Sequence, residues 1–130
     1  MVSLFRRATQ HRFYAARIAR VEVTAALARK ERAAQLTSDA LACVSTRFER
    51  EFTHRFVIIE ITTALLENAA ALARKHYLRG YDAVQLAAAL EAHVERTAMN
   101  LAPLTLVTAD NDLLAAAMAD GLSTDNPNNH

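Results

Sequence analysis

The chain has 130 residues, enough for one compact core, and we expect residues 1–130 to form a single domain. Apolar residues make up 52% of the chain while Gly and Pro contribute two each, a composition that favours helices with short connections over a turn-rich all-β fold. The net charge is only +1, and the single cysteine, Cys43, excludes an intrachain disulfide and a Cys-based zinc site, which is typical of a reducing compartment.

The first third of the chain predicts two helices with a brief strand between them. Residues 2–10 have the pattern of a short helix, and residues 12–16 predict a strand because Phe13 and Tyr14 favour pleated, half-buried positions. Apolar residues then recur every three or four positions over residues 18–32, and basic residues gather in the last turn. This second segment predicts a longer amphipathic helix.

The middle of the chain predicts a helix, a buried strand and another helix. A polar cluster at residues 37–39 can cap a helix that runs to about residue 54. Residues 56–61 (FVIIEI) form a nearly continuous apolar run, which is typical of a parallel strand covered on both faces. The threonines at 62 and 63 then cap a helix that Gly80 interrupts.

The last part of the chain continues the alternation. A helix is predicted from Tyr81 to the polar stretch before Pro103, followed by a buried strand over residues 104–108 (LTLVT). A loop over residues 109–112 leads into a short helix over residues 113–119.

Strands separated by helices of this length predict right-handed crossovers. The expected fold is therefore a three-layer α/β/α domain with a mainly parallel sheet and helices on both faces. Ligands in such open sheets bind beyond the carboxyl ends of the strands, so residues just after Thr108 are favoured site candidates.

Four carboxylates occupy positions that can meet at this edge. Glu22 lies in an early helical turn, Asp82 in the first turn of another helix, and Asp110 and Asp112 follow the strand over residues 104–108. Clustered carboxylates raise one another's proton affinity unless a cation compensates them, and oxygen donors with open positions suit Mg²⁺ in phosphate chemistry. Each acid also has a simpler interpretation: a helix-terminal charge for Asp82, an N-cap for Asp112, half of a surface ion pair for Glu22, and a turn residue for Asp110.

Three stretches carry a family resemblance in order and spacing. ARVEVTAALARKER (residues 19–32), LRGYDAVQLAAALEA (78–92) and TLVTADNDLLAAA (105–117) resemble the second, third and fourth acidic motifs of VapC-type PIN domains, and the end, GLSTDNP, is similar to the family's closing strand. The resemblance covers the chain from about Val2 to Pro127 and implies a PIN-like domain.

The resemblance also implies an activity, a cofactor and partners. In that family the motif acids bind Mg²⁺ or Mn²⁺ and catalyse endonucleolytic cleavage of RNA. Transferred by position, Glu22, Asp82 and Asp110 become the catalytic and metal-binding acids, with Asp112 as an auxiliary metal ligand and Thr108 as a supporting hydroxyl. A VapB-type antitoxin and a homodimer are further implications.

One feature of the family's pattern is absent. The family begins with a central strand that ends in an Asp-Thr or Asp-Ser pair, whereas no Asp precedes Glu22 in this chain. We therefore expect a domain that lacks its first central strand and one metal ligand, and whose neighbouring strands need another partner. A second copy, a rearranged N-terminus or an upstream segment could supply that strand.

Charge is distributed unevenly along the chain. Residues 1–32 carry eight basic and two acidic residues, whereas the remainder carries seven basic and twelve acidic residues. The basic third could hold a phosphate backbone near the acidic site, and its candidates for RNA binding are Arg17, Arg20 and Arg29. Solvated, Arg-rich helix faces are the alternative interpretation.

The remaining residues give weaker indications of a functional site. No histidine pair has the helical spacing of a zinc site, no Gly-rich loop can cradle phosphates, and Cys43 shares its helix with apolar residues. Tyr77 and Tyr81, close to Asp82, can stack a base or pack in the core or at its rim. The apolar stretch after Met1 is broken by Arg6 and Arg7, and 18 consecutive apolar residues occur nowhere, so we expect a soluble, cytoplasmic protein.

Three hypotheses follow from the sequence. The first is a metal-dependent endoribonuclease of a toxin–antitoxin system. The second is a catalytically deficient PIN-like module that acts by dimerisation or by binding antitoxin or RNA. The third is a structural helical protein whose acids are incidental.

Overall fold

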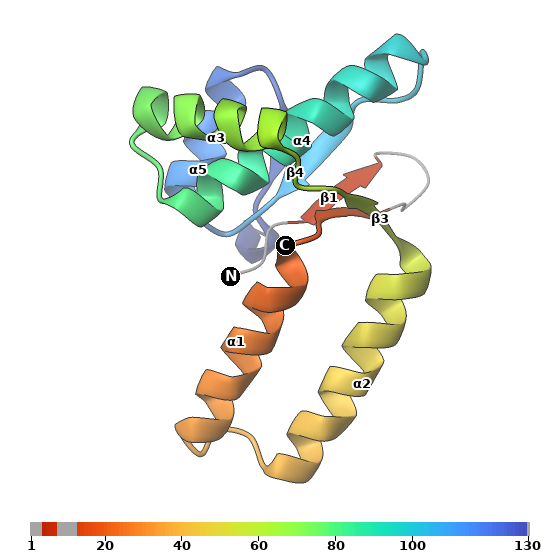
Figure 1. Cartoon of the computed structure of the whole chain (residues 1–130), viewed down its shortest axis with the longest axis vertical. Helices are drawn as coiled ribbons and strands as arrows, with labels where there is room; N and C mark the ends of the chain where they lie inside the picture. Colours follow the sequence, from red (N-terminus) through yellow and green to blue (C-terminus); the bar gives the residue numbers. More distant parts are fainter. Residues whose placement is uncertain (1–3, 8–12, 130) are drawn as a thin grey trace.

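The computed structural model describes residues 4–7 and 13–129 of the chain, and these residues form an α/β protein (Figure 1). In chain order the elements are β1 (Leu4–Arg7), β2 (Phe13–Ala16), α1 (Ala19–Arg32), α2 (Ser38–Arg55), β3 (Phe56–Ile59), α3 (Thr63–His76), α4 (Gly80–Ala98), β4 (Leu104–Val107), α5 (Asn111–Ala119), β5 (Ser123–Asp125) and a short 3₁₀ turn (Pro127–Asn129). The predicted helices and strands from β2 onward are confirmed, with shifts of a few residues at their ends.

The sheet is mixed, with the strand order β3-β2-β1-β4-β5. The outer pairs, β2 with β3 and β4 with β5, are parallel, whereas β1 runs antiparallel to both of its neighbours. The expected mainly parallel sheet is therefore wrong at its centre. The sequence predicted a helix over residues 2–10, but Leu4–Arg7 within this range is a strand. The other residues of the predicted helix lie outside the described residues.

The place at the centre of the sheet is filled by β1. Leu4–Arg7 pairs residue by residue with Leu104–Val107 of β4, and Phe5 and Arg6 face Tyr14 and Phe13 of β2. Without β1, the inner edges of β2 and β4 would expose unpaired backbone groups, which a strand between them satisfies. Of the three alternatives raised for the missing central strand, the structure has the rearranged N-terminal segment.

The sheet is buried on both faces along β2. Ala15 and Ala16 are both fully buried, and neighbouring residues of a strand point to opposite faces. Ala16 joins the main core with Leu86 of α4 and Leu106 of β4, whereas Ala15 packs with Ala19 of α1 and Phe52 of α2. Helices therefore cover the two sides of this strand.

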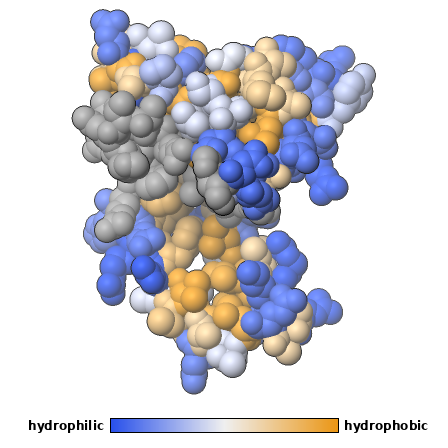
Figure 2. All heavy atoms as spheres, turned by 180° about the vertical axis from the view of Figure 1, so that it is seen from behind, coloured by the Kyte–Doolittle hydropathy of each residue, from blue (hydrophilic) through white to orange (hydrophobic). Residues whose placement is uncertain are grey.

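Helices α1 and α2 form a hairpin that projects away from the rest of the molecule (Figure 1). Among the described side chains of these two helices, only Ala19 and Phe52 are buried. Figure 2 shows apolar surface on this part of the molecule, where Val21 and Val44 are exposed. The hairpin thus joins the body only at its base.

None of the described helices is long and apolar enough to cross a membrane.

Candidate functional site

The topology of the sheet brings the candidate acids to one edge. Strands β2 and β4 both run antiparallel to β1, so they are parallel to each other and their carboxyl ends lie at the same edge. The chain leaves β2 at Ala16 and reaches Glu22 in the first turn of α1, and it leaves β4 at Val107 and reaches Asp110. Asp82 enters this edge from the first turn of α4.

The electrostatics of Asp82 show that these acids share one neighbourhood. Partial burial raises the pKa of Asp82 above its ordinary value, and the negative charges of Asp110 and, to a smaller extent, Glu22 raise it further. The positive charge of Arg79, the residue before α4, opposes this shift. Sequence analysis missed Arg79, although its place three residues before Asp82 is the signal that would have indicated it.

The three acids do not close around a common point. Glu22 and Asp82 are half-buried and Asp110 is exposed. In the part of the chain that the structure describes, no group of three His, Cys, Asp or Glu side chains lies close enough together to hold a metal ion. The structure therefore brings the acids within electrostatic range of one another but leaves the site open.

Asp110 is held in place by two hydrogen bonds. Its backbone N–H donates to the Thr108 Oγ1 at 3.1 Å, and its own carboxylate Oδ1 accepts from the Leu113 N–H at 2.9 Å. Thr108 is buried and its N–H donates to the Asp125 carbonyl at 3.1 Å, which ties this corner to β5. Asp110 is therefore the N-cap of α5, and the simpler interpretation of Asp112 as that cap is wrong because Asp112 lies inside the helix.

The three candidate RNA-binding arginines all lie near carboxylates. Arg17 Nε donates to both oxygens of Glu60 at 2.9 and 2.7 Å, and Arg20 Nε donates to Glu49 Oε1 at 2.8 Å. Hydrogen bonding to Glu60 raises the pKa of Arg17, and the same contact lowers the pKa of Glu60. Both ion pairs are exposed, so each contributes little to stability, and each arginine can exchange its carboxylate partner for another anion.

Arg29 approaches Glu22 itself. Its Nη2 lies 3.9 Å from Glu22 Oε1, which is the surface pair that the sequence offered as the simpler interpretation of Glu22. The contact is at the long end of an ion pair, so it only partly offsets the charge of Glu22.

Two further polar residues of α4 lie beside the acids. Burial raises the pKa of Tyr81, and the charges of Glu22 and Asp82 raise it further, so both carboxylates lie within electrostatic range of its hydroxyl. Gln85, one turn further along α4, is fully buried, and neither of its amide atoms has a hydrogen-bond partner in the part of the chain that the structure describes. The sequence named Tyr81 only as a base-stacking or packing residue and missed Gln85. A polar residue on the buried stripe of that helix, three positions after Asp82, was the available signal.

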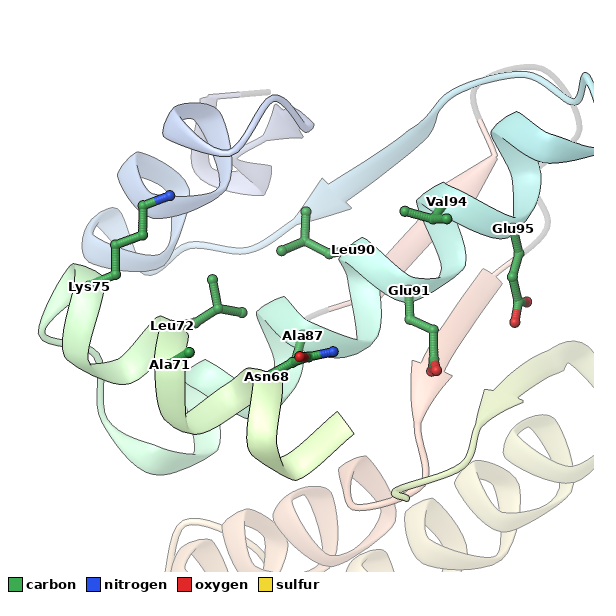
Figure 3. A pocket seen from close by; sticks show the side chains of 9 residues that line it. All are labelled: Asn68, Ala71, Leu72, Lys75, Ala87, Leu90, Glu91, Val94 and Glu95. Carbon is green, nitrogen blue, oxygen red and sulfur yellow. The ribbon is translucent and has the colours of Figure 1, made fainter. Parts of the chain in front are cut away.

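An apolar groove of about 600 Å³ lies away from the acids, between α3 and α4 (Figure 3). Leu72 of α3 and Ala87 and Leu90 of α4 line its floor, and Glu91, Glu95 and Lys75 flank it. None of the candidate site residues lines this groove.

Comparison with known proteins supplies an independent test of the family resemblance. No family model matches the chain. The chain is 43% identical over 74 residues to the proteins named Ribonuclease VapC45 and Ribonuclease VapC49, from two strains of Mycobacterium tuberculosis, CDC 1551 and H37Rv. Over this stretch the chain is similar to VapC-type ribonucleases.

The similarity has a limited extent. The aligned residues make up 57% of this chain and 51% of each VapC relative, so the match spans about half of the relatives' length. The resemblance to VapC-type ribonucleases that the three motifs indicated is thus confirmed as a sequence similarity, whereas the roles of individual residues stay predictions.

Proposed function

We propose that the chain is a PIN-like, metal-dependent endoribonuclease of a VapC-type toxin–antitoxin system, which hydrolyses RNA phosphodiesters. The observation that carries this proposal is that Glu22, Asp82 and Asp110 come from different elements to one sheet edge, where the charges of Asp110 and Glu22 act on Asp82. The similarity to two proteins named ribonucleases supports the same reaction class. The helices on both faces of β2 agree with a three-layer α/β/α domain.

The donor set fits Mg²⁺ or Mn²⁺ by its chemistry. Carboxylate oxygens are the protein ligands that Mg²⁺ prefers, and this ion usually keeps several waters, so an open site with few protein ligands suits it. In this proposal Glu22, Asp82 and Asp110 hold the ion and Asp112 assists from the first turn of α5. When bound, the ion supplies Lewis acidity toward water and the phosphate and offsets negative charge at the reacting phosphate.

The chain's own residues set the geometry of this reaction. Thr108 fixes the backbone of Asp110, and the cap to Leu113 leaves only part of the Asp110 carboxylate for a ligand. Because burial and neighbouring negative charges raise the pKa of Asp82, a bound cation would favour its ionised form, which coordinates best. Arg17, Arg20 and Arg29 would hold the RNA backbone by exchanging their exposed carboxylate partners for phosphates.

Two protein partners belong to the same proposal. A VapB-type antitoxin would cover the acidic edge, and the projecting hairpin with its apolar surface offers an additional contact area (Figure 2). A second copy of the chain would form a homodimer, for which the apolar groove between α3 and α4 is a candidate surface.

RNA cleavage with and without Mg²⁺ or Mn²⁺ tests the proposed reaction. We expect metal-dependent cutting by the wild-type chain and no cutting by Asp82→Asn, which keeps the shape of the side chain but removes its charge. Cutting that persists in Asp82→Asn would identify a contaminating nuclease instead.

The open arrangement of the acids favours a second candidate. Because no three described acids lie within metal-binding range of one another, a PIN-like module that binds antitoxin or RNA without cutting also fits the fold. RNA binding without cleavage by both wild type and Asp82→Asn would support this alternative over the enzyme.

A further inference from the structure

Three buried polar atoms beside the acidic edge have no hydrogen-bond partner among the described residues: the Tyr81 hydroxyl and both amide atoms of Gln85. Gln85 is 0% exposed. Residues 81 and 85 are four positions apart, so they lie on the same face of α4. The Gln85 amide lies next to the Tyr81 hydroxyl without forming a hydrogen bond of normal geometry.

Tyr81 and Gln85 connect the acids to the buried part of α4. The Tyr81 hydroxyl is within electrostatic range of Glu22 and Asp82, and Gln85 lies behind it on the next turn. The neighbouring residues Leu86, Ala88 and Ala89 are all buried and apolar, so packing alone does not require a polar side chain at Gln85. Roughly 90% or more of buried polar groups in native proteins are paired, so three unpaired atoms at one place require a physical explanation.

The open state of the acids supplies that explanation. Like charges repel one another, and a tyrosine hydroxyl within electrostatic range of two carboxylates can donate to either only when it approaches closely enough. A carboxamide can at the same time donate to the tyrosine oxygen, which fixes the direction of the hydroxyl proton. Carboxylates that bind a cation are usually hydrogen-bonded by such a supporting layer of residues.

We propose that Tyr81 and Gln85 are positioning residues of the acidic site: the Gln85 amide orients the Tyr81 hydroxyl, which would donate a hydrogen bond to Glu22 or Asp82 when these carboxylates hold a divalent cation. This inference rests on the proposed metal-dependent function and adds two residues to it. It gives these buried polar atoms, which have no partner among the described residues, a role at the acidic site.

Mn²⁺ binding by the full chain, followed by calorimetric titration and by the Mn²⁺ electron paramagnetic resonance signal, tests the proposal. Tyr81→Phe and Gln85→Met keep the approximate volume of each side chain but remove the polar atoms. We expect each to weaken Mn²⁺ affinity by about 10- to 100-fold. We also expect their Tm without metal to be unchanged or higher, because no hydrogen bond is lost in the free protein.

Tyr14→Phe is the matched control. The Tyr14 hydroxyl accepts a hydrogen bond from Arg96 Nη1 at 3.0 Å, so the same chemical change should lower Tm and leave Mn²⁺ affinity unchanged. A lower Tm for Tyr81→Phe or Gln85→Met would mean that the atoms are paired in the free protein, and it would overturn the proposal.

Asp82→Asn separates this inference from the proposed function. If Asp82→Asn loses Mn²⁺ binding while Tyr81→Phe and Gln85→Met bind as tightly as wild type, the supporting role is wrong and the metal site stands. If the wild type does not bind Mn²⁺, or Asp82→Asn binds it equally well, the proposed function fails and this inference fails with it.

Discussion

Helices α4 and α1 are both rich in alanine, yet they lie in opposite environments. Helix α4 packs between the sheet and α3, and its buried residues include Ala83, Ala87, Ala88, Ala89 and Ala92. Helix α1 packs mainly against α2 and the base of the sheet, and Ala19 is its single buried residue. Small side chains allow close packing only where a second layer is present, so composition alone does not show which helix is in the core.

The comparison divides the molecule into a packed body and a hairpin that depends on its base. The body consists of the sheet with α3, α4 and α5, and one buried cluster runs through all of these helices. The hairpin is attached by the small cluster of Ala15, Ala19 and Phe52 and by the exposed ion pair of Arg17, just before α1, with Glu60, just after β3. The body should therefore determine the stability of the protein, and the hairpin should contribute little of it.

Replacing one apolar side chain in the body and one in the hairpin should show the largest difference between the two regions. Leu106 is fully buried in β4, and Leu106→Ala should lower the free energy of unfolding by about 2–5 kcal/mol because it leaves a cavity. Val44 of α2 is 43% exposed, and Val44→Ala should change that free energy by less than about 0.5 kcal/mol. Urea unfolding followed by circular dichroism measures both values. Equal losses would show that the hairpin is packed against another surface in solution.

The helical part of this division could be predicted from local sequence, because apolar residues that recur every three or four positions mark helices wherever they finally pack. The strand Phe56–Ile59 was likewise marked by its continuous apolar run. The strand Leu4–Arg7 was not, because its conformation depends on pairing with residues almost a hundred positions away, and long-range pairing overrides local preference.

The candidate site shows the same limit. The positions of Glu22, Asp82 and Asp110 after strands or at helix starts were sufficient to predict a shared edge. The burial of Gln85 depends on how α4 lies on the sheet, which no local pattern records. The role of Asp110 as N-cap depends on where α5 begins, and helix ends are the least predictable boundaries.

A second test concerns the link between α3 and α5 inside the body. Burial alone would raise the pKa of Asp120, but hydrogen bonds from Lys75 (2.7 Å) and His76 (2.9 Å) lower it below its ordinary value of 3.8. Asp120→Asn should therefore lower the free energy of unfolding at pH 7 by about 1.5–3 kcal/mol, because it weakens hydrogen bonds to a charged group.

The pH dependence of this link has a defined sign. Because the folded pKa of Asp120 is depressed, its stabilising contribution is present above pH 3.8 and is lost as the pH falls through the lower, folded value. Glu67→Gln, at an exposed carboxylate of α3, is the control and should change the unfolding free energy by less than about 0.5 kcal/mol. Equal effects of the two substitutions in urea unfolding would contradict a specific link.

The smallest expected effect is at the junction of the hairpin and the body, where Glu22 of α1 lies near Asp82 of α4. The raised pKa of Asp82 means that its stabilising contribution is present at low pH and is lost as the pH rises through the folded value. Asp82→Asn should therefore raise the free energy of unfolding at pH 7 by about 0.5 kcal/mol, after allowance for solvent screening, and the gain should disappear in acid.

Asp39→Asn provides the matched control, because Asp39 also lies in a first helical turn but in the hairpin. The helix dipole stabilises the negative charge of Asp39 without the carboxylate repulsion that acts on Asp82. Removing this charge should therefore lower the free energy of unfolding slightly, by about 0.3–1 kcal/mol. Opposite signs for the two substitutions would show that repulsion at the junction, and not helix position, determines the energy of Asp82. The same sign would mean that the acids are too far apart to interact, and the site would then lose its electrostatic reason to bind a cation.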